Sequence, residues 1–552
     1  MKQTFKLFAA LALGVLVTAA CSEGKLLQSY ITPDRSEISE IPAKDPAAVS
    51  LIVNTNTNWM VLDVPSWIQV EPEMGHGDAI ITITPSANFK NENTETFDRM
   101  GSFRIAGNAN DPGNRTGVSV TVTVKQRGYV PVVDPDAGIG GIPSLEEFLA
   151  FAQAVSTGGS CSRWLNQDGE VELQTDIDLS SVLDWTPIGI AKLGSSVKAA
   201  ASSDNYFQGV FNGGHHSITG IRWTFDASTG DYNSYGLFGM ASNATIKDLV
   251  LGEKGDYISI EGTPEAPLAA GALLAVGDAV TVKGVTNNVD VIFNGSNDPQ
   301  FAMAGIVAKG DRCVIGGESD DEAVVNNGNI VAKSVITLTE AGEGGHMLGG
   351  IQGYMHWGSI VKAVNNGTIS CGSGRSGGIV ASINSGVTAD EFSLVKGCVN
   401  RGTVRRDLYG NSAVTGNQKR MGGILGGAEG WYNKVEDCVN EGNVFAEYLC
   451  RCGGCVGHSK IQVIGFENKG IILSDKDSSH GPGWLGGYFD SVANAAKVGV
   501  LNIARCKMGG KVGSWTEYKD NPEGAPAATI DNVLGYNNKP DTQFNLSEII
   551  QQ

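Results

Sequence analysis

The sequence predicts an all-β protein in which a small β-sandwich is followed by a long parallel β-solenoid. Short strand-like segments fill residues 37–128, and two motifs rich in glycine recur between about residues 280 and 490. Glycine makes up 74 of the 552 residues, which is roughly twice its ordinary share of about 7%. Because these glycines fall at repeated positions and not in low-complexity runs, they indicate stacked structural repeats.

The first twenty residues have the pattern of a secretory signal. Two lysines precede an apolar run at residues 8–17, which is too short to span a bilayer as a helix. The small residues before Cys21 resemble a lipobox, after which bacterial lipoproteins are cleaved and acylated on the new N-terminal cysteine, although Thr18 replaces the usual leucine. We therefore expect a signal peptide over residues 1–20, lipidation of Cys21 and a tether over residues 21–36; cleavage without lipidation is the alternative.

The charge of the chain limits its expected partners, and the cysteine count limits its disulfide bonds. The formal net charge is −19, and no cluster of basic residues stands out along the chain, so nucleic acid is not expected as a partner. Of the ten cysteines, lipidation of one leaves an odd number, which cannot be fully paired in disulfides within one molecule.

Residues 37–128 contain strand-like segments separated by turns. Residues 50–53 and 79–83 are rich in apolar and β-branched side chains, and residues 118–124 alternate at a period of two. A segment of this length made of short strands is typical of a β-sandwich. Residues 129–142 contain two prolines, three glycines and no amphipathic period, and we interpret them as a linker.

The sandwich segment resembles the BACON domain of gut Bacteroidetes. The resemblance rests on Asn58-Trp59, Ser66-Trp67-Ile68, Gly75, Asn88, Arg99-Met100-Gly101 and residues 122–126. It implies an immunoglobulin-like sandwich, a domain often placed next to carbohydrate-active or glycan-binding modules, and it implies no sugar-binding residue. We expect Trp59 and Trp67 to pack in the sandwich core and not to stack on sugar.

A helix is expected to follow the linker. Ser144 and Glu147 form a capping box. Its apolar face consists of Leu145, Phe148, Leu149, Phe151 and Ala152. Such a helix can cover the open end of a solenoid, whose first rung would otherwise expose unpaired backbone groups.

The first repeated motif is apolar–apolar–Asn–x–Gly–x–Ile/Val. Its asparagines are Asn326, Asn365, Asn400 and Asn440, with degenerate copies at Asn287 and Asn468. Equivalent residues of stacked rungs lie about 4.8 Å apart, so we expect these side chains to form a hydrogen-bonded ladder. The apolar position two residues before each asparagine is expected to be one buried slot, filled by Val285, Val324, Ala363, Cys398 and Cys438.

The second motif is Gly/Ala–Gly–Ile. Its copies are Ala304-Gly305-Ile306, Gly349-Gly350-Ile351, Gly377-Gly378-Ile379, Gly422-Gly423-Ile424, Gly453-Gly454-Cys455 and Gly486-Gly487-Tyr488. We expect glycine here to allow close approach of neighbouring backbones. The residue before each copy is predicted to form a second buried slot, filled by Met303, Leu348, Ser376, Met421, Cys452 and Leu485.

Residues 142–488 resemble the GLUG-repeat, adhesin-like right-handed β-helices of surface proteins. The resemblance rests on Trp185–Gly189, Phe207–Gly220, Gly236–Gly239 and Ile246–Leu249, with Asn212 where the family usually has aspartate. It implies a right-handed parallel β-helix with an N-terminal capping helix. We expect the helix and solenoid to span residues 143–490 and a C-terminal cap to span residues 491–552.

A cysteine cluster has the spacing of a zinc site but is predicted to belong to the core. Cys450, Cys452, Cys455 and His458 could ligate zinc by spacing alone. Two of these cysteines fall in slots that apolar residues fill in other rungs, so we expect small core side chains. No metal, cofactor or catalytic residue is predicted.

Aromatic residues near the second motif suggest a binding face. Tyr354, Trp357, Trp431, Tyr432 and Trp484 are the candidates for stacking on sugar rings. The alternative is that these rings pack over the edges of their own rungs. A polysaccharide lyase or glycosidase is the rival function, but no paired carboxylates are apparent at stacked positions.

We therefore expect a lipid-anchored outer-membrane protein that acts as an adhesin or glycan-binding protein. Its partner would be a host or dietary glycan, mucin or another surface protein. The alternatives are a polysaccharide-degrading β-helix enzyme and a structural spacer without a ligand. Surface lipoproteins of Bacteroidetes tend to carry acidic residues after the acylated cysteine, whereas this chain has only Glu23 followed by Lys25. The cell surface is expected for an adhesin, and this weak acidic signal leaves a periplasm-facing anchor as the alternative.

Overall fold

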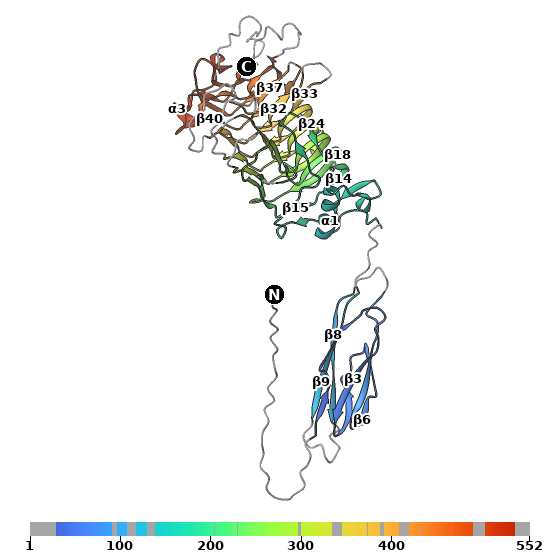
Figure 1. Ribbon diagram of the computed structural model, residues 1–552. Helices are drawn as coiled ribbons and strands as arrows, with labels where there is room; N and C mark the ends of the chain where they lie inside the picture. The colour runs from blue at the N-terminus through green and yellow to red at the C-terminus, as the bar shows by residue number, and fades with distance from the viewer. Residues whose placement is uncertain are drawn as a thin grey trace, which may run out of the picture. The chain divides into compact units, whose positions relative to one another are not determined.

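The chain forms two compact units, Met1–Pro135 and Asp136–Gln552 (Figure 1). The computed structural model describes residues 29–90, 96–107, 118–129 and 138–535, except 204, 229, 296–299, 334–344, 373, 387–390, 408–418, 431 and 490–502. Cys21 and Trp431, both singled out above, lie outside the described residues. The boundary between the units falls inside the predicted linker.

The first unit is a β-sandwich of two sheets. One sheet has the order β1 (Ile31–Pro33), β3 (Val49–Thr55), β7 (Ala79–Pro85), β5 (Ile68–Glu71). The other has the order β2 (Glu37–Ile41), β9 (Ser119–Gln126), β8 (Arg99–Gly107), β4 (Asn58–Leu62), β6 (Met74–His76). Strand β1 pairs antiparallel with β3, so the folded unit begins inside the range predicted as a tether.

Alternating apolar residues of both sheets form the sandwich core. Trp59 is buried there, and its indole N–H donates to the Gly77 carbonyl at 3.0 Å. A Cβ at Gly75 would lie 2.5 Å from the Trp59 ring, so glycine is required at this contact. Trp67 is half-buried against the core beneath the Arg99 guanidinium, 4.5 Å from the ring centroid. The prediction that both tryptophans pack within the sandwich is confirmed.

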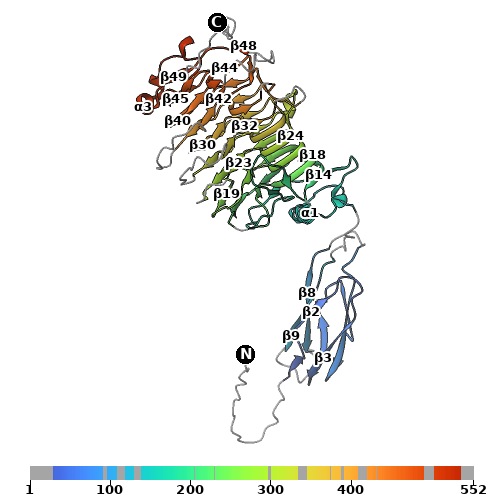
Figure 2. The same cartoon turned by 45° about the horizontal axis from the view of Figure 1, so that its top comes forward.

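The second unit is a parallel β-solenoid (Figure 2). Its sides are two single-strand ladders and one wide sheet, in which equivalent strands of successive rungs pair in parallel. The nine-stranded ladder consists of β16 (Arg222–Asp226), β19 (Tyr257–Glu261), β22 (Asp290–Phe293), β26 (Ile330–Ala332), β30 (Ile369–Cys371), β35 (Val404–Arg406), β40 (Val444–Leu449), β45 (Ile471–Asp475) and β49 (Lys511–Gly513).

Each of the first eight of these strands is followed along the chain by one strand of an eight-stranded ladder. It consists of β17 (Ser234–Tyr235), β20 (Leu268–Gly271), β23 (Phe301–Ala304), β27 (His346–Gly349), β31 (Arg375–Gly377), β36 (Arg420–Gly422), β41 (Arg451–Gly453) and β46 (Gly481–Gly483). A two-stranded hairpin, β12 (Lys192–Leu193) with β13 (Ala201–Ser202), lies outside these ladders.

The wide sheet has 21 strands because most rungs cross it in two or three short segments. In order these are β10 (Glu170–Glu172), β11 (Ile177–Asp178), β14 (Phe207–Asn212), β15 (Ser217–Thr219), β18 (Phe238–Leu251), β21 (Leu274–Asn287), β24 (Val307–Gly316), β25 (Val325–Asn326), β28 (Gln352–Val361), β29 (Val364–Asn365), β32 (Val380–Asn384), β33 (Ser393–Lys396), β34 (Val399–Asn400), β37 (Leu425–Glu429), β38 (Lys434–Glu436), β39 (Val439–Asn440), β42 (Val456–Ser459), β43 (Gln462–Ile464), β44 (Glu467–Asn468), β47 (Gly486–Phe489) and β48 (Ile503–Ala504).

A ladder of buried asparagines runs through the solenoid, as predicted. Each side-chain amide donates to the next asparagine oxygen at 2.8–2.9 Å, from Asn287 through Asn326, Asn365, Asn400 and Asn440 to Asn468. Each also donates to the carbonyl two residues ahead at 2.8–3.1 Å. Their burial is nearly complete, so both hydrogen bonds replace water that the interior excludes.

The glycines of the second motif make room for this ladder. A Cβ at Gly350 would lie 2.2 Å from the Gly378 carbonyl oxygen and 2.4 Å from the Asn365 side chain. The equivalent glycines Gly305, Gly378 and Gly423 face Asn326, Asn400 and Asn440 in the same way. The two repeated motifs are therefore complementary halves of one packing arrangement.

The predicted core slots exist, with one correction at the last rung. Cys398 and Cys438 are fully buried in the column that also holds Val324 and Ala363. The column of Ile424 and Cys455 continues to Leu485, not to Tyr488, because Gly453 pairs with Gly483. Leu485 therefore leaves the slot of Cys452, where Pro482 stands instead.

The N-terminal helix α1 (Leu145–Ser156) covers the first rungs. Ser144 caps it by accepting from the Glu147 backbone N–H at 3.3 Å. The Glu147 carboxylate does not complete the capping box but accepts from Arg163 at 2.6 Å and from the Trp164 indole at 2.9 Å. Phe148 and Phe151 are fully buried in the solenoid core. A short 3₁₀ helix, η1 (Ser162–Trp164), follows.

Rung register continues beyond residue 490, where a separate cap was predicted. Strand β48 pairs with β43, and β49 pairs with β45, each in parallel. The short helix α3 (Trp515–Tyr518) packs against β45 and β40. The 3₁₀ helices elsewhere in the described chain are η2 (Asp320–Glu322), η3 (Pro522–Gly524) and η4 (Ile530–Asn532).

The asparagine ladder predicts a large difference between two neighbouring residues. Asn365→Ala removes one donor and one acceptor from the buried ladder and is expected to lower the free energy of unfolding by about 2–4 kcal/mol. Asn366 makes a similar 2.8 Å bond to Asn327, but on the exposed side, so Asn366→Ala is expected to change stability by about 0.5 kcal/mol or less. Chemical denaturation of both variants measures the difference, and equal losses would contradict a structural role for the ladder.

Candidate functional site

A column of left-handed backbone residues bends the wide sheet. Asn243, Ala279, Arg312 and Trp357 have φ values of 49°, 52°, 55° and 61°. The residues that precede them, Ser242, Asp278, Asp311 and His356, are register partners in successive rungs. The column therefore forms a corner that repeats at the same place in four rungs.

The residue types at this corner are unexpected for its backbone conformation. Glycine and asparagine adopt positive φ at little cost, whereas other residues lose about 1–2 kcal/mol. Gly430, with φ of 86°, stands at the equivalent position two rungs after Trp357. Arg312 and Trp357 therefore stand against the conformational preference, as Lys362, Tyr448 and Arg505 do elsewhere in the solenoid. Such strain concentrates at functional sites.

Charged side chains of adjacent rungs meet beside the corner. The Arg312 guanidinium hydrogen-bonds to the Asp278 carboxylate, and its Nε lies 3.8 Å from Asp311 Oδ1. His356 Nδ1 lies 3.3 Å from the same Asp311 oxygen. The hydrogen bond with Asp278 and its charge raise the pKa of Arg312. We call Asp278, Asp311, Arg312, His356 and Trp357 the corner cluster.

The corner cluster corrects the expectation that no carboxylates stand at stacked positions. Asp278 and Asp311 are direct register partners on adjacent strands. Their side chains are 34% and 44% exposed, so both can contact a ligand. Sequence reasoning missed them, although the pattern Gly277-Asp278 and Gly310-Asp311 repeats the same pair of residue types.

Trp357 is the predicted aromatic that the structure brings to this site. Its ring is half-buried and its centroid lies 5.7 Å from that of His356. The indole N–H is buried without a hydrogen-bond partner among the described residues. A half-exposed ring next to hydrogen-bonding groups is the arrangement that a stacking site needs.

Two other predicted aromatics are buried, which corrects their assignment as stacking residues. Tyr354 is 2% exposed beneath Lys309, and its hydroxyl accepts from Asn384 at 3.2 Å. Trp484 is fully buried in the core. It occupies the position of the glycine that faces asparagine in earlier rungs, beyond Asn468 where the ladder ends. The space left free at the end of the ladder thus accounts for its burial.

No contact between Tyr432, another predicted aromatic, and the corner cluster is found among the described residues. Tyr432 is half-buried, and its backbone N–H donates to the Gly386 carbonyl at 3.0 Å. Its role in ligand binding stays a prediction, and so does that of Trp431, which lies outside the described residues.

The cysteine cluster near the C-terminal end consists of buried thiols. Burial raises the pKa of Cys450 to about 11 and raises the pKa values of Cys452 and Cys455 well above the ordinary range. Metal binding requires the thiolate, so this environment opposes it. Among the described residues no group of three His, Cys, Asp or Glu side chains is placed to hold a metal ion.

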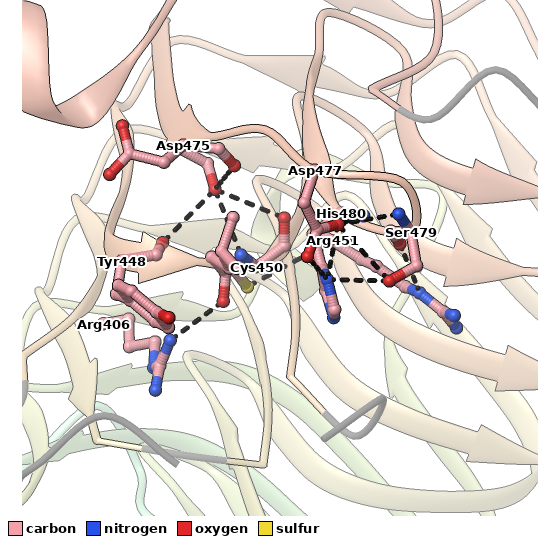
Figure 3. A network of polar contacts seen from close by, with 10 residues as sticks. Arg406, Tyr448, Cys450, Arg451, Asp475, Asp477, Ser479 and His480 are labelled. Carbon is pink, nitrogen blue, oxygen red and sulfur yellow. Dashed lines mark hydrogen bonds and ion pairs between the residues drawn. The ribbon is translucent and has the colours of Figure 1, made fainter. Parts of the chain in front are cut away.

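Polar contacts around these cysteines close a turn between two strands (Figure 3). The backbone N–H of His480 donates to Asp477 at 2.7 Å, and Arg451 Nε donates to the Ser479 carbonyl at 3.3 Å. Burial opposes ionisation of Asp477, but hydrogen bonds from Ser479 and His480 outweigh it and lower the pKa of Asp477. These contacts fix the turn before β46.

Stacking also creates a column of arginines that the sequence analysis did not find. Arg375, Arg420 and Arg451 are register partners, each at least nine-tenths buried. Glu429 Oε1 lies 3.4 Å from both Arg375 and Arg420. Burial and the neighbouring Arg375 lower the pKa of Arg420 to about 10. The recurrent pattern Arg-x-Gly-Gly in the sequence could have revealed this column. The three arginines are far apart along the chain, so they come together only in the folded protein.

Comparison with known proteins does not show a family for this chain. No family model and no curated protein matches the chain. A solved structure described as a "putative immunoglobulin A1 protease" from Bacteroides ovatus is similar at 17% identity, covering 60% of this chain and 80% of that chain, with a TM-score of 0.26. In the described part of the chain, no helix is long and apolar enough to cross a membrane.

The backbone strain at the corner can be measured at Ala279. Ala279→Gly is expected to raise the free energy of unfolding by about 1 kcal/mol, because glycine adopts the left-handed conformation without a Cβ clash. Ala308→Gly in β24, which lies outside the left-handed region, is the control and is expected to lower stability by at least about 0.5 kcal/mol. Thermal and chemical unfolding check both values. A loss of stability in Ala279→Gly would show that the left-handed conformation at this position is not strained.

Proposed function

We propose that this β-solenoid is a glycan-binding protein and that the corner cluster is its binding site. The observation that carries the proposal is the presence of Arg312 and Trp357 at left-handed positions beside stacked charged residues. A purely structural corner would be better served by glycine, as at Gly430. The strain is explained if these two side chains serve a ligand.

The chemistry of the corner cluster suits a polyhydroxylated ligand. The face of a sugar ring packs on an aromatic ring such as that of Trp357, while hydroxyl groups donate to carboxylates and accept from guanidinium groups. Asp278, Asp311 and Arg312 offer all these groups on adjacent rungs. Because rungs repeat along the solenoid, neighbouring sugar units of a chain could contact successive rungs.

Hydrolysis of a polysaccharide is the second candidate, and the stacked pair Asp278 and Asp311 is the observation that favours it. A glycosidase needs one carboxyl group protonated as general acid. The Arg312 guanidinium hydrogen-bonds to Asp278 and its Nε lies 3.8 Å from Asp311, so both carboxylates have the same cationic partner. Alternating charges of this kind offer hydrogen bonds to a polar ligand, and binding is the preferred function.

Export and anchoring complete the proposal. The segment before Cys21 has a secretory pattern ending in a lipobox-like cysteine, which supports a lipid anchor on the outer membrane, facing the cell surface. The likeness of the first unit to BACON domains and of the solenoid to GLUG-repeat adhesins supports the same assignment.

Substitution at the corner tests the binding site. Trp357→Ala and Arg312→Gly are each expected to weaken binding to a responsive glycan at least about tenfold, since an aromatic or charged contact contributes about 1–3 kcal/mol. Asn243→Gly, at the same corner in an earlier rung, is the matched control and should bind as the unmodified protein does. Binding is measured first on a glycan and mucin array and then by titration.

Two results would contradict the assignment. Binding that survives both corner substitutions would place the site elsewhere on the molecule. Release of reducing ends or unsaturated uronate from polysaccharides, lost in Asp278→Asn or Asp311→Asn, would establish an enzyme. If the folded protein binds no glycan on the array, the result would favour the alternative that the solenoid is a structural spacer without a ligand.

Anchoring is tested by treating intact cells with protease. The unmodified protein is expected to be membrane-associated and cleaved from outside, whereas Cys21→Ser is expected to leave the membrane fraction. Ser22→Ala, next to the acylation site, serves as the control and should retain the anchor. Protection of the unmodified protein on intact cells, with digestion after lysis, would indicate a periplasm-facing anchor.

A further inference from the structure

Two buried cations lie where the chain passes from the nine-stranded to the eight-stranded ladder. Arg406 is the last residue of β35, and Lys419 immediately precedes β36, so both belong to one rung. Their side chains are well inside the protein, since the two residues are 2% and 5% exposed. Burial lowers the pKa of Lys419 to about 8, and the nearby charge of Arg406 acts in the same direction. Two like charges are therefore close together in a region with little water.

Arg406 stands in a column that is otherwise apolar. Its register partner in the next rung is Ala446, and the same position holds Cys371 and Ala332 in the two rungs before. All three of these residues belong to the hydrophobic core of the solenoid. A guanidinium group in this column has lost its water, so each of its N–H groups needs a partner from the protein or from a ligand.

Backbone carbonyls satisfy only part of this guanidinium group. The Nε of Arg406 donates to the Gly372 carbonyl at 2.9 Å, and its Nη1 donates to the Leu449 carbonyl at 2.9 Å (Figure 3). Its Nη2 is buried and has no hydrogen-bond partner among the described residues. The Lys419 ammonium likewise has no acceptor in the part of the chain that the structure describes. One edge of a guanidinium group and one ammonium group thus lack hydrogen bonds.

The nearest carboxylates do not pair with these two cations. Asp407, next to Arg406 in the chain, lies 3.4 Å from Arg405. Glu429 lies beside the column of buried arginines. The segment that joins the two cations, residues 408–418, contains no aspartate or glutamate. Removing one partner of a buried ion pair is strongly destabilising, so two buried cations without a counter-charge favour binding of an anion.

The groups beside the two cations are neutral thiols. Both Arg406 and Lys419 act on the ionisation of Cys450, and Cys371 is a further neighbour of Arg406. Burial raises the pKa of Cys450 to about 11 although both cations lower it, so this thiol carries no charge at neutral pH. Glu447 affects the pKa of Arg406 less than these thiols do. The surroundings are therefore polarisable but do not balance the positive charge.

We propose that Arg406 and Lys419 bind a small monovalent anion of the halide class, such as chloride, between them. The anion accepts hydrogen bonds from Arg406 Nη2 and from the ammonium group, and it offsets the repulsion between the two cations. A sulfate or phosphate ion would bring four oxygens, most of which would find no donor here. An acidic sugar is too large for two groups that are 2% and 5% exposed. The site shares no residue with the corner cluster, so the inference does not depend on glycan binding.

Anion-specific stabilisation tests the proposal. Thermal unfolding of the protein is compared in sodium chloride and in sodium methanesulfonate at equal ionic strength, because methanesulfonate is too large for the site. Chloride is expected to raise the unfolding midpoint by at least about 2 °C, since a ligand that binds only the folded state stabilises it. Equal midpoints in the two salts at every concentration tested would overturn the proposal.

Matched variants locate the effect. Lys419→Met removes the ammonium group, keeps a side chain of similar length and is expected to abolish the difference between the two salts. Lys469→Met, at an exposed lysine that lies 3.2 Å from Glu441, is the control and should keep the chloride response. A chloride response that survives in Lys419→Met would refute the site. A lower midpoint for Lys419→Met than for the unmodified protein in methanesulfonate would also contradict it, because the ammonium group would then have a partner within the protein.

Bromide gives the position of the anion directly. In crystals grown with sodium bromide, an anomalous difference peak is expected within about 3.5 Å of both Arg406 Nη2 and Lys419 Nζ. The peak should disappear in crystals of Lys419→Met and remain in crystals of Lys469→Met. The absence of a bromide peak between the two cations in the unmodified protein would overturn the proposal whether or not the protein binds glycans.

Discussion

The buried asparagine ladder is the constraint on which the rest of the solenoid depends. Each amide must meet both the next asparagine and a carbonyl of its own rung, and both bonds form only when adjacent rungs are in register. A shift of one residue would turn the side chain to the opposite face and leave buried polar groups without partners. The facing glycines permit only this alignment, since a Cβ at Gly350 would overlap Asn365. Register is thereby fixed along most of the solenoid.

Fixed register aligns the outer surface as strictly as the interior. Side chains at equivalent outward positions stand above one another, so a single recurrent residue type becomes a column. Buried positions align in the same way, as the column of Arg375, Arg420 and Arg451 on the eight-stranded ladder shows. On the wide sheet the outward line carries Asp278, Asp311 and His356, with Arg312 placed between two carboxylates. The net charge of the protein is strongly negative, but these local groups of charged side chains determine which ligands each face can bind.

The ends of the solenoid obey a different rule because a terminal rung lacks one neighbour. At the N-terminal end α1 and the stack of Phe148, Trp185 and Trp223 cover the exposed rung. Aromatic rings fill this irregular space well, as the near-complete burial of all three shows. At the other end the rung after Asn468 has no asparagine, and Trp484 fills the space where that side chain would lie. Both ends therefore concentrate aromatic residues for packing reasons before any function is considered.

The sequence alone determined the all-β class, the stacked repeats, the asparagine ladder, the core positions of Cys398 and Cys438, and the capping helix. These follow from local spacing and from the burial of equivalent residues, which repeat visibly along the chain. Only the tertiary structure decided that Leu485 rather than Tyr488 continues the isoleucine column, that Trp484 is buried, and that Asp278 meets Asp311 and Arg312. The choice between Gly483-Trp484-Leu485 and Gly486-Gly487-Tyr488 as the last copy of the second motif depends on pairing with Gly453, and the backbone strain at Arg312 and Trp357 depends on the bend of a whole sheet. Such long-range pairings leave no periodic trace in the sequence, so the candidate site became visible only in the folded chain.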